Sequence, residues 1–254
     1  MIDLHSHILP GLDDGARDLD EAVEIGRAAV ADGIHTIAAT PHVRSDYPTT
    51  TDAMERGVAE LRSALARAGL DLVLLPGGEL ALEQLDRLSG DDLRRFGLGG
   101  NPSYLLLETP YFGWPLAFAD HVSRLTAAGI TAVIGHPERN SGVQGEPERL
   151  VDLIQAGALV QITAASLDGR LGPRPRKCAQ RLLDAELVHM IGSDAHSPGL
   201  REAGLSKACA AVADGDLARW LSEDVPGAIV RGEPLPPRPQ RKRRAGFLAR
   251  LLGR

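Results

Sequence analysis

Nine histidine and carboxylate residues, spread from residue 5 to residue 196, occupy positions where they could act together. Each lies at or near the end of a short apolar run that is typical of a buried strand: His5, His7, Asp14, His42, Glu79, Glu108, His136, Asp194 and His196. Imidazole and carboxylate groups are ligands for zinc, manganese and iron. Nine ligands exceed what one ion needs, so the set predicts two or three divalent metal ions. Such a cluster suits in-line displacement at phosphorus.

The spacing of these residues distinguishes them from ordinary polar strand ends. His5 and His7 are two residues apart, so an extended strand puts both rings on the same side. Five of the eight histidines fall at strand ends beside glycine, proline or another candidate ligand. The remaining three, His35, His121 and His189, are interpreted as structural or surface residues.

Two acidic residues near the first strand leave alternatives open. Asp13 competes with Asp14 for the role of ligand, and the other of the two is expected to cap a turn or to accept a hydrogen bond from a ligand. Asp3 has the same strand parity as His5 and His7, and it is a candidate for orienting a ligand.

Two arginines are candidate catalytic residues that clamp an anion. Arg139 follows the strand-end His136, and Arg201 lies five residues beyond His196. Guanidinium groups bind the non-bridging oxygens of a phosphate in a bidentate manner. The alternative for each is a solvent-exposed loop arginine. Glu138, between His136 and Arg139, is expected to pair locally.

Other hydrolytic chemistries are disfavoured by missing motifs. The sequence has no Cys-x5-Arg loop for a thiol phosphatase and no Gly-x-Ser-x-Gly elbow. The two cysteines, Cys178 and Cys209, do not form a disulfide framework and fit a reducing cytoplasm.

The candidate ligands require elements that bring distant strand ends together. Apolar runs rich in Val, Ile and Leu cover residues 2–5, 36–39, 72–75, 104–107, 132–135, 159–162 and 188–191. Helical candidates alternate with them at residues 19–31, 53–68, 116–128, 147–156, 176–185 and 203–213. This order predicts an α/β protein whose seven parallel strands close, or nearly close, into a barrel, with the site at the carboxyl ends of the strands. An open doubly wound sheet is the alternative, but the first strand is not followed by a glycine-rich phosphate loop.

Composition and charge indicate the size of the domain and the classes of partner that the protein can bind. The 254 residues, 43% of them hydrophobic, are enough for one barrel-sized domain, predicted at residues 1–231. No apolar run is long enough to cross a membrane and no secretory signal is evident, so a cytoplasmic protein is expected. Residues 238–254 carry seven basic residues; subtracting these from the net charge of −6 leaves −13 for residues 1–237. This acidic body, with only 4% aromatic residues, disfavours nucleic acid as a partner.

Residues 232–254 are predicted to form a proline-rich linker and a basic, flexible tail outside the domain. Residues 232–239 contain four prolines, and Phe247, Leu248, Leu251 and Leu252 recur among arginines at helical spacing. The alternative to a solvated tail is a short helix that contacts a membrane surface or a partner.

The motifs together resemble a known family. The opening MIDLHSHILPGLDDGA, TPH at 40–42, GGE at 77–79, LLE at 106–108, GHPERN at 135–140 and GSDAH at 192–196 are similar to the PHP superfamily of metal-dependent phosphoesterases. Within it, residues 1–231 resemble the bacterial protein-tyrosine phosphatases of capsular and exopolysaccharide loci, the CpsB/YwqE type. Thr109-Pro110 and Ser197-Pro198 differ slightly from that pattern.

The resemblance implies a distorted TIM-like (β/α)7 barrel of the PHP type with three metal ions, manganese being favoured over zinc or iron. His5, His7, Glu79 and Asp194 would hold the first ion. Glu79, Glu108 and His136 would hold the second, and Asp14, His42 and His196 the third. Arg139 and Arg201 would bind the phosphate.

The resemblance also implies a substrate: phosphotyrosine in the C-terminal tail of a cognate bacterial tyrosine autokinase that controls polysaccharide synthesis. Two alternatives remain from the sequence. One is a phosphoesterase that acts on a sugar phosphate, histidinol phosphate or a nucleotide. The other is a metal-stabilised scaffold without activity. The aromatic residues Tyr111, Phe112 and Trp114 are candidates either for packing a phenol ring or for an ordinary hydrophobic loop.

Overall fold

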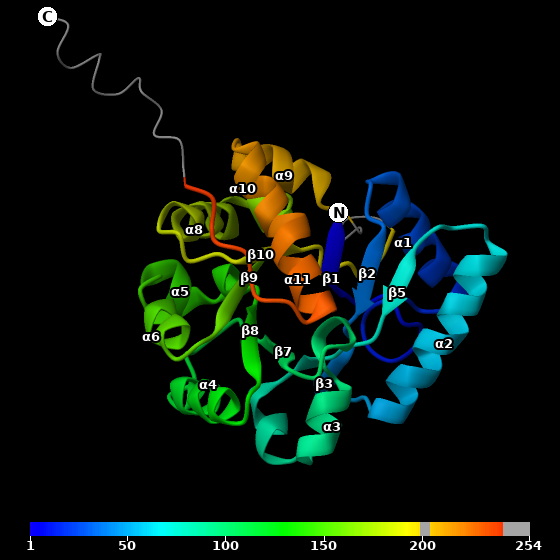
Figure 1. Ribbon diagram of the computed structural model, residues 1–254, viewed down its shortest axis with the longest axis horizontal. Coiled ribbons are helices and arrows are strands. Elements are labelled where there is room, and N and C mark those ends of the chain that lie inside the picture. The colour runs from blue at the N-terminus through cyan, green and yellow to red at the C-terminus, as the bar shows by residue number, and fades with distance from the viewer. Residues whose placement is uncertain (199–203, 241–254) are drawn as a thin grey trace, which may run out of the picture.

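The first half of the structure is organised around a small parallel sheet. The computed structural model describes residues 1–198 and 204–240 (Figure 1). Strands β1 (Ile2–Ser6), β2 (Thr36–Ala39) and β5 (Val73–Leu75) form a three-stranded sheet in the order β1-β2-β5, with all neighbours parallel. Ile37 pairs with Leu74 in this sheet, and both side chains are buried.

The second sheet has seven strands in the order β10-β9-β8-β7-β6-β3-β4. Its members are β3 (His42–Arg44), β4 (Tyr47–Pro48), β6 (Glu79–Leu80), β7 (Tyr104–Glu108), β8 (Thr131–Gly135), β9 (Leu159–Thr163) and β10 (Met190–Gly192). Neighbours are parallel except in the hairpin β3–β4. Every apolar run predicted as a strand therefore contains or overlaps one, whereas β3, β4 and β6 were not predicted.

Chain interruptions divide the strands between the two sheets. Pro41 separates β2 from β3, and Gly77-Gly78 separates β5 from β6. In each pair the first strand belongs to the three-stranded sheet and the second to the seven-stranded sheet. Proline lacks the N–H that a ladder needs, and glycine weakens a strand. Near the end of β1, a bridge joins Ser6 to Ala195, and Asp194 N donates to the His5 carbonyl at 2.8 Å. The ladders do not form one closed sheet, so the structure confirms a mixed α/β fold but not the predicted closed barrel.

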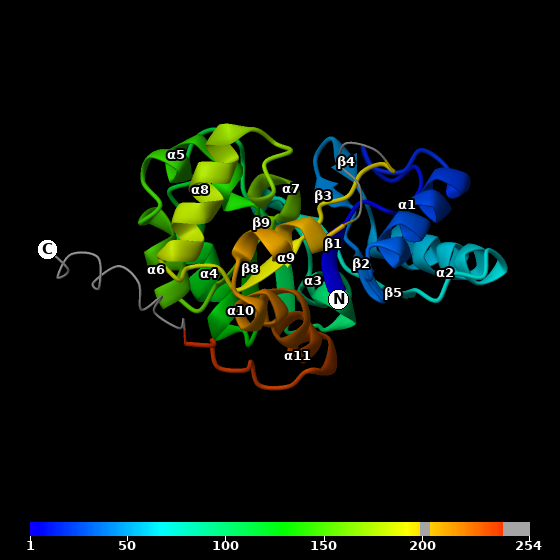
Figure 2. The ribbon, with the colours of Figure 1, turned by 90° about the horizontal axis from the view of Figure 1, so that it is seen from above.

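Helices surround the strands and complete the core (Figures 1 and 2). The longer ones are α1 (Leu19–Ala31), α2 (Thr51–Arg67), α4 (Phe118–Ala127) and α8 (Pro173–Asp184). Shorter ones are α3 (Gly90–Arg95), α5 (Ser141–Gly145), α6 (Arg149–Gln155), α7 (Ala164–Leu167), α9 (Ser206–Val212), α10 (Gly215–Arg219) and α11 (Val225–Arg231). Single turns are η1 (Leu82–Asp86), η2 (Leu98–Gly100), η3 (Pro137–Arg139) and η4 (Trp220–Asp224).

Local sequence explains where the two first helices begin. Asp18 caps α1 by accepting a hydrogen bond from Glu21 N, and Thr50 caps α2 by accepting one from Ala53 N. Short polar side chains at this position satisfy backbone donors that the first turn leaves open. The central strand of the three-stranded sheet, β2, is buried along its whole length, as expected for a parallel strand enclosed between layers.

Helix α11 ends at Arg231, the residue at which the domain was predicted to end, and the chain beyond it stays on the body as far as residue 240 (Figure 2). Trp220 Nε1 donates to the Pro236 carbonyl at 3.0 Å, and Arg238 donates to the Val188 carbonyl at 2.6 Å. The Arg238 guanidinium also lies 5.2 Å from the Trp220 ring centroid. The linker predicted from residue 232 is therefore in contact with the body at Pro236 and Arg238.

Residues 241–254, which carry most of the predicted basic tail, lie outside the described residues. In the described part of the chain, no helix has both the length and the apolar character needed to cross a bilayer.

Candidate metal centre

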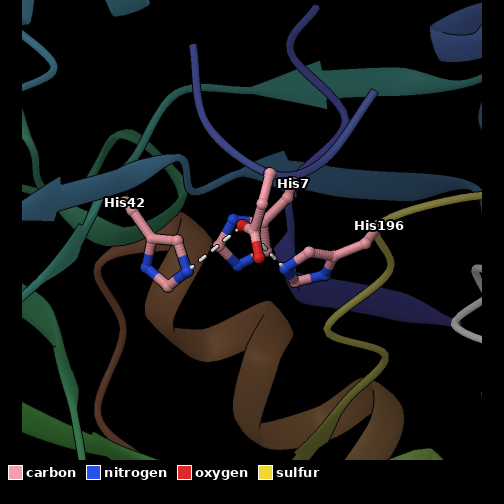
Figure 3. Close-up of side chains that lie close together, drawn as sticks. His7, His42 and His196 are labelled. Carbon is pink, nitrogen blue, oxygen red and sulfur yellow. Dashed lines mark ion pairs between the residues drawn. The ribbon is translucent and has the colours of Figure 1, made fainter. Parts of the chain in front are cut away.

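The predicted ligands converge at the carboxyl ends of the strands. Their ligand atoms form three overlapping groups in which all atoms lie within 4.8 Å of one another. The groups are His7, Asp14, His42 and His196; His5, Glu79 and His136; and His5, His7 and Asp194. Figure 3 shows the rings of His7, His42 and His196 gathered around one point. The structure thus brings together eight of the nine residues that the sequence singled out.

Strand register explains why residues so distant in sequence meet. In the parallel ladder β3–β6, His42 pairs directly with Glu79. Glu108 and Gly135 pair at the ends of β7 and β8, so His136 follows immediately beyond Glu108. Because the carboxyl ends of parallel strands meet at one edge, each strand adds its terminal side chain to the same place.

Glu79 is the hub of the cluster. Its Oε2 lies 2.9 Å from His42 Nδ1, 3.3 Å from His7 Nε2 and 3.6 Å from His5 Nε2. Its Oε1 lies 2.6 Å from His136 Nε2. The side chain is completely buried. One carboxylate that faces four imidazoles is the arrangement expected of a ligand shared between metal ions.

Asp194 occupies the other side of the histidine pair. Its Oδ1 lies 3.4 Å from His5 Nε2 and 3.2 Å from His7 Nε2, while Oδ2 lies 2.6 Å from a terminal nitrogen of Arg139. Asp194 has φ 53° and His136 has φ 38°, in the left-handed region that side chains other than glycine seldom adopt. Such backbone strain is held in place by surrounding structure and is frequent at functional sites.

Burial and neighbouring positive charge shift the pKa values of the two central carboxylates, Glu79 and Asp194, in opposite directions. Burial raises the pKa of Glu79, but the charges of His5 and His136 outweigh it and hold the pKa well below its ordinary value. Burial likewise raises the pKa of Asp194, and Arg139 and His5 more than offset this, so its pKa also lies well below the ordinary value. Both groups are therefore anionic, as metal ligands must be.

Five buried polar atoms of the cluster indicate that it fits metal ions. Although Glu79 Oε2 and His42 Nδ1 lie 2.9 Å apart, no contact with the geometry of a hydrogen bond is made within the described residues by the following atoms: His5 Nε2, His7 Nε2, His42 Nδ1, His136 Nδ1 and Glu79 Oε2. Buried polar atoms are nearly always satisfied, so a concentration of exceptions in one place needs an explanation. Nitrogen and carboxylate donors suit manganese, zinc or iron.

Glu108 differs from the other candidates. Its Oε2 lies 3.8 Å from His42 Nδ1, but Oε1 receives a hydrogen bond of 2.7 Å from Arg44. Arg44 was not predicted as a site residue. It lies two residues beyond His42 on β3, so period-two alternation puts both side chains on one face, and this spacing was the available signal.

Two buried side chains hold histidines from behind. Asp13 Oδ2 lies 2.6 Å from His7 Nδ1 and also accepts a hydrogen bond from His42 N at 2.8 Å. Gln161 Oε1 lies 2.7 Å from His5 Nδ1. Asp14 Oδ1 lies 3.5 Å from His42 Nε2 and 3.3 Å from His196 Nε2, so Asp14 faces the cluster, whereas Asp13 contacts His7 from behind. Gln161 was missed, although it is a polar residue within an otherwise apolar strand.

We expect Asp13→Ala to weaken metal binding by roughly 10- to 100-fold, the usual cost of removing a group that orients a ligand. The variant would free the His7 ring to rotate and would leave His42 N without its acceptor. Chelator competition for manganese measures the affinity, and Asp13→Asn, which keeps an acceptor, should lose less. Unchanged affinity in folded Asp13→Ala would show that His7 is positioned by other groups.

Of the two predicted arginines, the structure describes one. Arg139 pairs with Asp194, and its other terminal nitrogen lies 3.4 Å from the Tyr111 hydroxyl. Only 7% of its side chain is exposed. Arg201 lies outside the described residues.

Several neighbouring groups are structural. Asp3 accepts hydrogen bonds from His5 N and Ser193 N, so it fastens β1 to the end of β10. Glu138 pairs locally, as predicted, by accepting hydrogen bonds from Thr163 N and Ser166 Oγ. Burial raises the pKa of the Cys178 thiol to about 12, which makes it a poor nucleophile.

Comparisons with known proteins agree with this geometry. A family model described as capsular polysaccharide synthesis, CpsB/CapC, matches residues 1–224. Tyrosine-protein phosphatase YwqE of Bacillus subtilis is 37% identical over 207 residues, which cover 78% of each chain. Putative tyrosine-protein phosphatase CapC of Staphylococcus aureus is 34% identical over 201 residues, covering 78% of this chain and 77% of the relative. A solved chain from work on YwqE and Streptococcus pneumoniae CpsB, described as unique metal-dependent tyrosine phosphatases, superposes with a TM-score of 0.85 at 32% identity. It covers 95% of this chain and 100% of its own.

Proposed function

This chain belongs to the CpsB/CapC family, and we propose that it is a metal-dependent tyrosine-protein phosphatase. The observation that carries the proposal is the buried cluster of His and carboxylate ligands with five polar atoms that make no hydrogen bond within the described residues. The relatives named tyrosine-protein phosphatases supply the reaction class. A degenerate site would have lost some of these ligands, so the cluster disfavours a scaffold without activity.

The finer assignment follows the arrangement of the groups. We propose that His5, His7, Glu79 and Asp194 hold one ion, that Glu79, Glu108 and His136 hold a second, and that Asp14, His42 and His196 hold a third. The position of Glu79 between His5 and His136 supports a bridging role. Manganese is the proposed metal. The bridge between Ser6 and Ala195 supports a distorted (β/α)7 barrel as the underlying architecture.

The bound ions would activate water and neutralise charge on the phosphoryl group. The residues of the chain position the substrate and the ligands around it. Arg139 is proposed to bind non-bridging phosphate oxygens, and Arg201 is a second candidate for this role from the sequence. Asp13 and Gln161 fix the ring orientations of His7 and His5. Tyrosinate is a fair leaving group because the phenol pKa is about 10, so the reaction does not require a strong general acid.

The proposed partner is the phosphotyrosine-bearing C-terminal tail of a bacterial tyrosine kinase that controls capsular or exopolysaccharide synthesis. The family description supports a role in capsule synthesis. With this substrate we also propose a cytoplasmic location. The basic residues in 241–254 remain a sequence-based candidate for contact with an anionic membrane surface.

A panel of phosphate esters tests the proposal. The manganese-loaded protein should hydrolyse a phosphotyrosine peptide with a kcat/KM well above that for the matching phosphoserine peptide, a sugar phosphate and histidinol phosphate. Asp194→Asn serves as the control for contaminating phosphatases. A preference for a small phosphate ester over the phosphotyrosine peptide would replace the proposed substrate while retaining the metal centre.

A further inference from the structure

A cavity of about 750 Å³ opens beside the metal centre. Glu108, a proposed ligand, and Arg44, which contacts it, line one part of the cavity. Tyr111 and Phe112 form one wall, from the loop between β7 and α4, and Leu82 in η1 belongs to another. This size falls within the range of pockets that bind whole organic ligands. A group bound at the metal centre can therefore extend into the cavity without leaving the protein surface.

The loop that borders the cavity exposes an unusual amount of apolar surface. Four large hydrophobic residues are strongly exposed in the described part of the chain, and three of them lie within six positions: Tyr111 at 46%, Phe112 at 84% and Leu116 at 99%. The fourth, Val73, lies on β5 and is 52% exposed. Clustered apolar exposure of this kind marks a binding surface more often than a scattered residue does.

The exposed loop is anchored to the body. Asn140 Nδ2 donates to the carbonyls of Pro110 and Gly113 at 2.6 and 2.7 Å, and Ser141 N donates to the Tyr111 carbonyl at 3.0 Å. Trp114 packs against Phe118 with ring centroids 5.3 Å apart, so this third aromatic residue supports the loop. The Phe112 side chain is thus presented to solvent from a fixed backbone.

Tyr111 connects the cavity to the reaction centre. Its ring stacks on that of His136, with centroids 6.3 Å apart and planes at 8°, and its hydroxyl lies 3.4 Å from Arg139. Phe112, the next residue, lines the cavity outside this pair. A phosphate held at Arg139 and the metal ligands would therefore lie on one side of Tyr111, with the apolar cavity wall beginning immediately next to it.

We infer that this cavity binds an apolar side chain next to the phosphotyrosine in the polypeptide substrate, with Phe112 as the main contact. The inference rests on the proposed function and adds a preference within the substrate sequence. The cavity adjoins the metal centre at Glu108 and Tyr111. Its occupant is therefore expected to be a part of the substrate molecule whose phosphate is bound at the metal centre. The cation in the lining, Arg44, is already paired with Glu108 and Asp46, and Glu83 adds a negative charge, which disfavours an acidic side chain there.

Peptides that differ only beside the phosphotyrosine test the inference on the manganese-loaded full-length protein. Leucine and glycine are compared at the position before the phosphotyrosine and at the position after it. At one of these two positions, the leucine peptide should have a KM about tenfold lower than the glycine peptide, because leucine buries apolar surface in the cavity. Aspartate there should give a KM no lower than glycine. Phe112→Ser should remove the leucine preference and leave hydrolysis of free phosphotyrosine unchanged. Val73→Ser, at an exposed hydrophobic position remote from the cavity, should keep the preference.

The outcomes separate the inference from the function on which it rests. Equal kcat/KM for the leucine, glycine and aspartate peptides, with normal hydrolysis of free phosphotyrosine, would overturn the inference and leave the phosphatase assignment intact. An equal loss for free phosphotyrosine and peptides in Phe112→Ser would overturn it as well, because the cavity would then hold the phenol ring itself. No hydrolysis of any phosphotyrosine substrate would overturn both.

Discussion

Replacing Glu79 by glutamine is expected to lower kcat/KM on a phosphotyrosine peptide by on the order of 10³-fold, at the upper end of the effect of removing one preorganised charged group. The carboxylate faces four buried imidazoles, and its Oε2 contacts three of them without the geometry of a hydrogen bond. Glutamine removes the negative charge shared among the four imidazoles and replaces one carboxylate oxygen by an NH2 group, which is a donor and would not serve as a metal ligand. Metal content per chain should fall together with activity.

Steady-state kinetics and elemental analysis of the same preparation check this expectation. Glu60→Gln in α2 is the matched control, since it makes the same chemical change at an exposed residue outside both the metal centre and the cavity. Circular dichroism should show that Glu79→Gln is folded. A folded Glu79→Gln protein with full metal content and normal kcat/KM would contradict the role of Glu79 as the shared ligand.

Asp194→Asn is expected to reduce kcat by roughly 10²- to 10³-fold and to destabilise the fold. The substitution removes the negative charge between His5, His7 and Arg139, and it leaves the nearly buried Arg139 guanidinium without its ion pair. Breaking a buried pair from one side typically costs about 3–5 kcal/mol. Asparagine is preferable to alanine here because it tolerates the left-handed backbone at φ 53° better.

A double-mutant cycle separates the two effects. Arg139→Met removes the charge that Asp194→Asn would strand, so the double variant should recover part of the free energy of unfolding in urea while it remains inactive. Additive losses of stability would mean that the pair of Asp194 and Arg139 contributes little to the fold. Normal kcat in Asp194→Asn would contradict its placement in the metal centre.

Much of the site could be predicted because strand geometry restricts where ligands lie. Period-two alternation placed His5 and His7 together, and the common edge of parallel strands brought His136 and Asp194 to them. The distances among these groups confirm that part of the reasoning. The supporting residues were harder to predict, because Gln161 and Arg44 are recognised only from the partners across the sheet that they contact.

The architecture was predicted less completely than the site. The apolar runs marked the strands, but they did not reveal that Pro41 and Gly77-Gly78 divide them between two sheets. Ladder breaks depend on which backbone N–H groups find partners in the folded chain. The contact of residues 232–240 with the body escaped prediction for a similar reason, since the proline-rich composition carries no sign of the Trp220 and Val188 groups that hold it.

The most direct test of the central claim is hydrolysis of a phosphotyrosine peptide by chelator-stripped protein, before and after manganese is restored. The stripped protein should be inactive, because without metal ions nothing activates water or offsets the negative charge that the phosphoryl group and the buried carboxylates Glu79 and Asp194 bring together, and stoichiometric manganese should restore turnover. Restoration should fail in Glu79→Gln under the same conditions. Undiminished hydrolysis by fully stripped protein, verified by elemental analysis, would contradict a metal-dependent phosphatase.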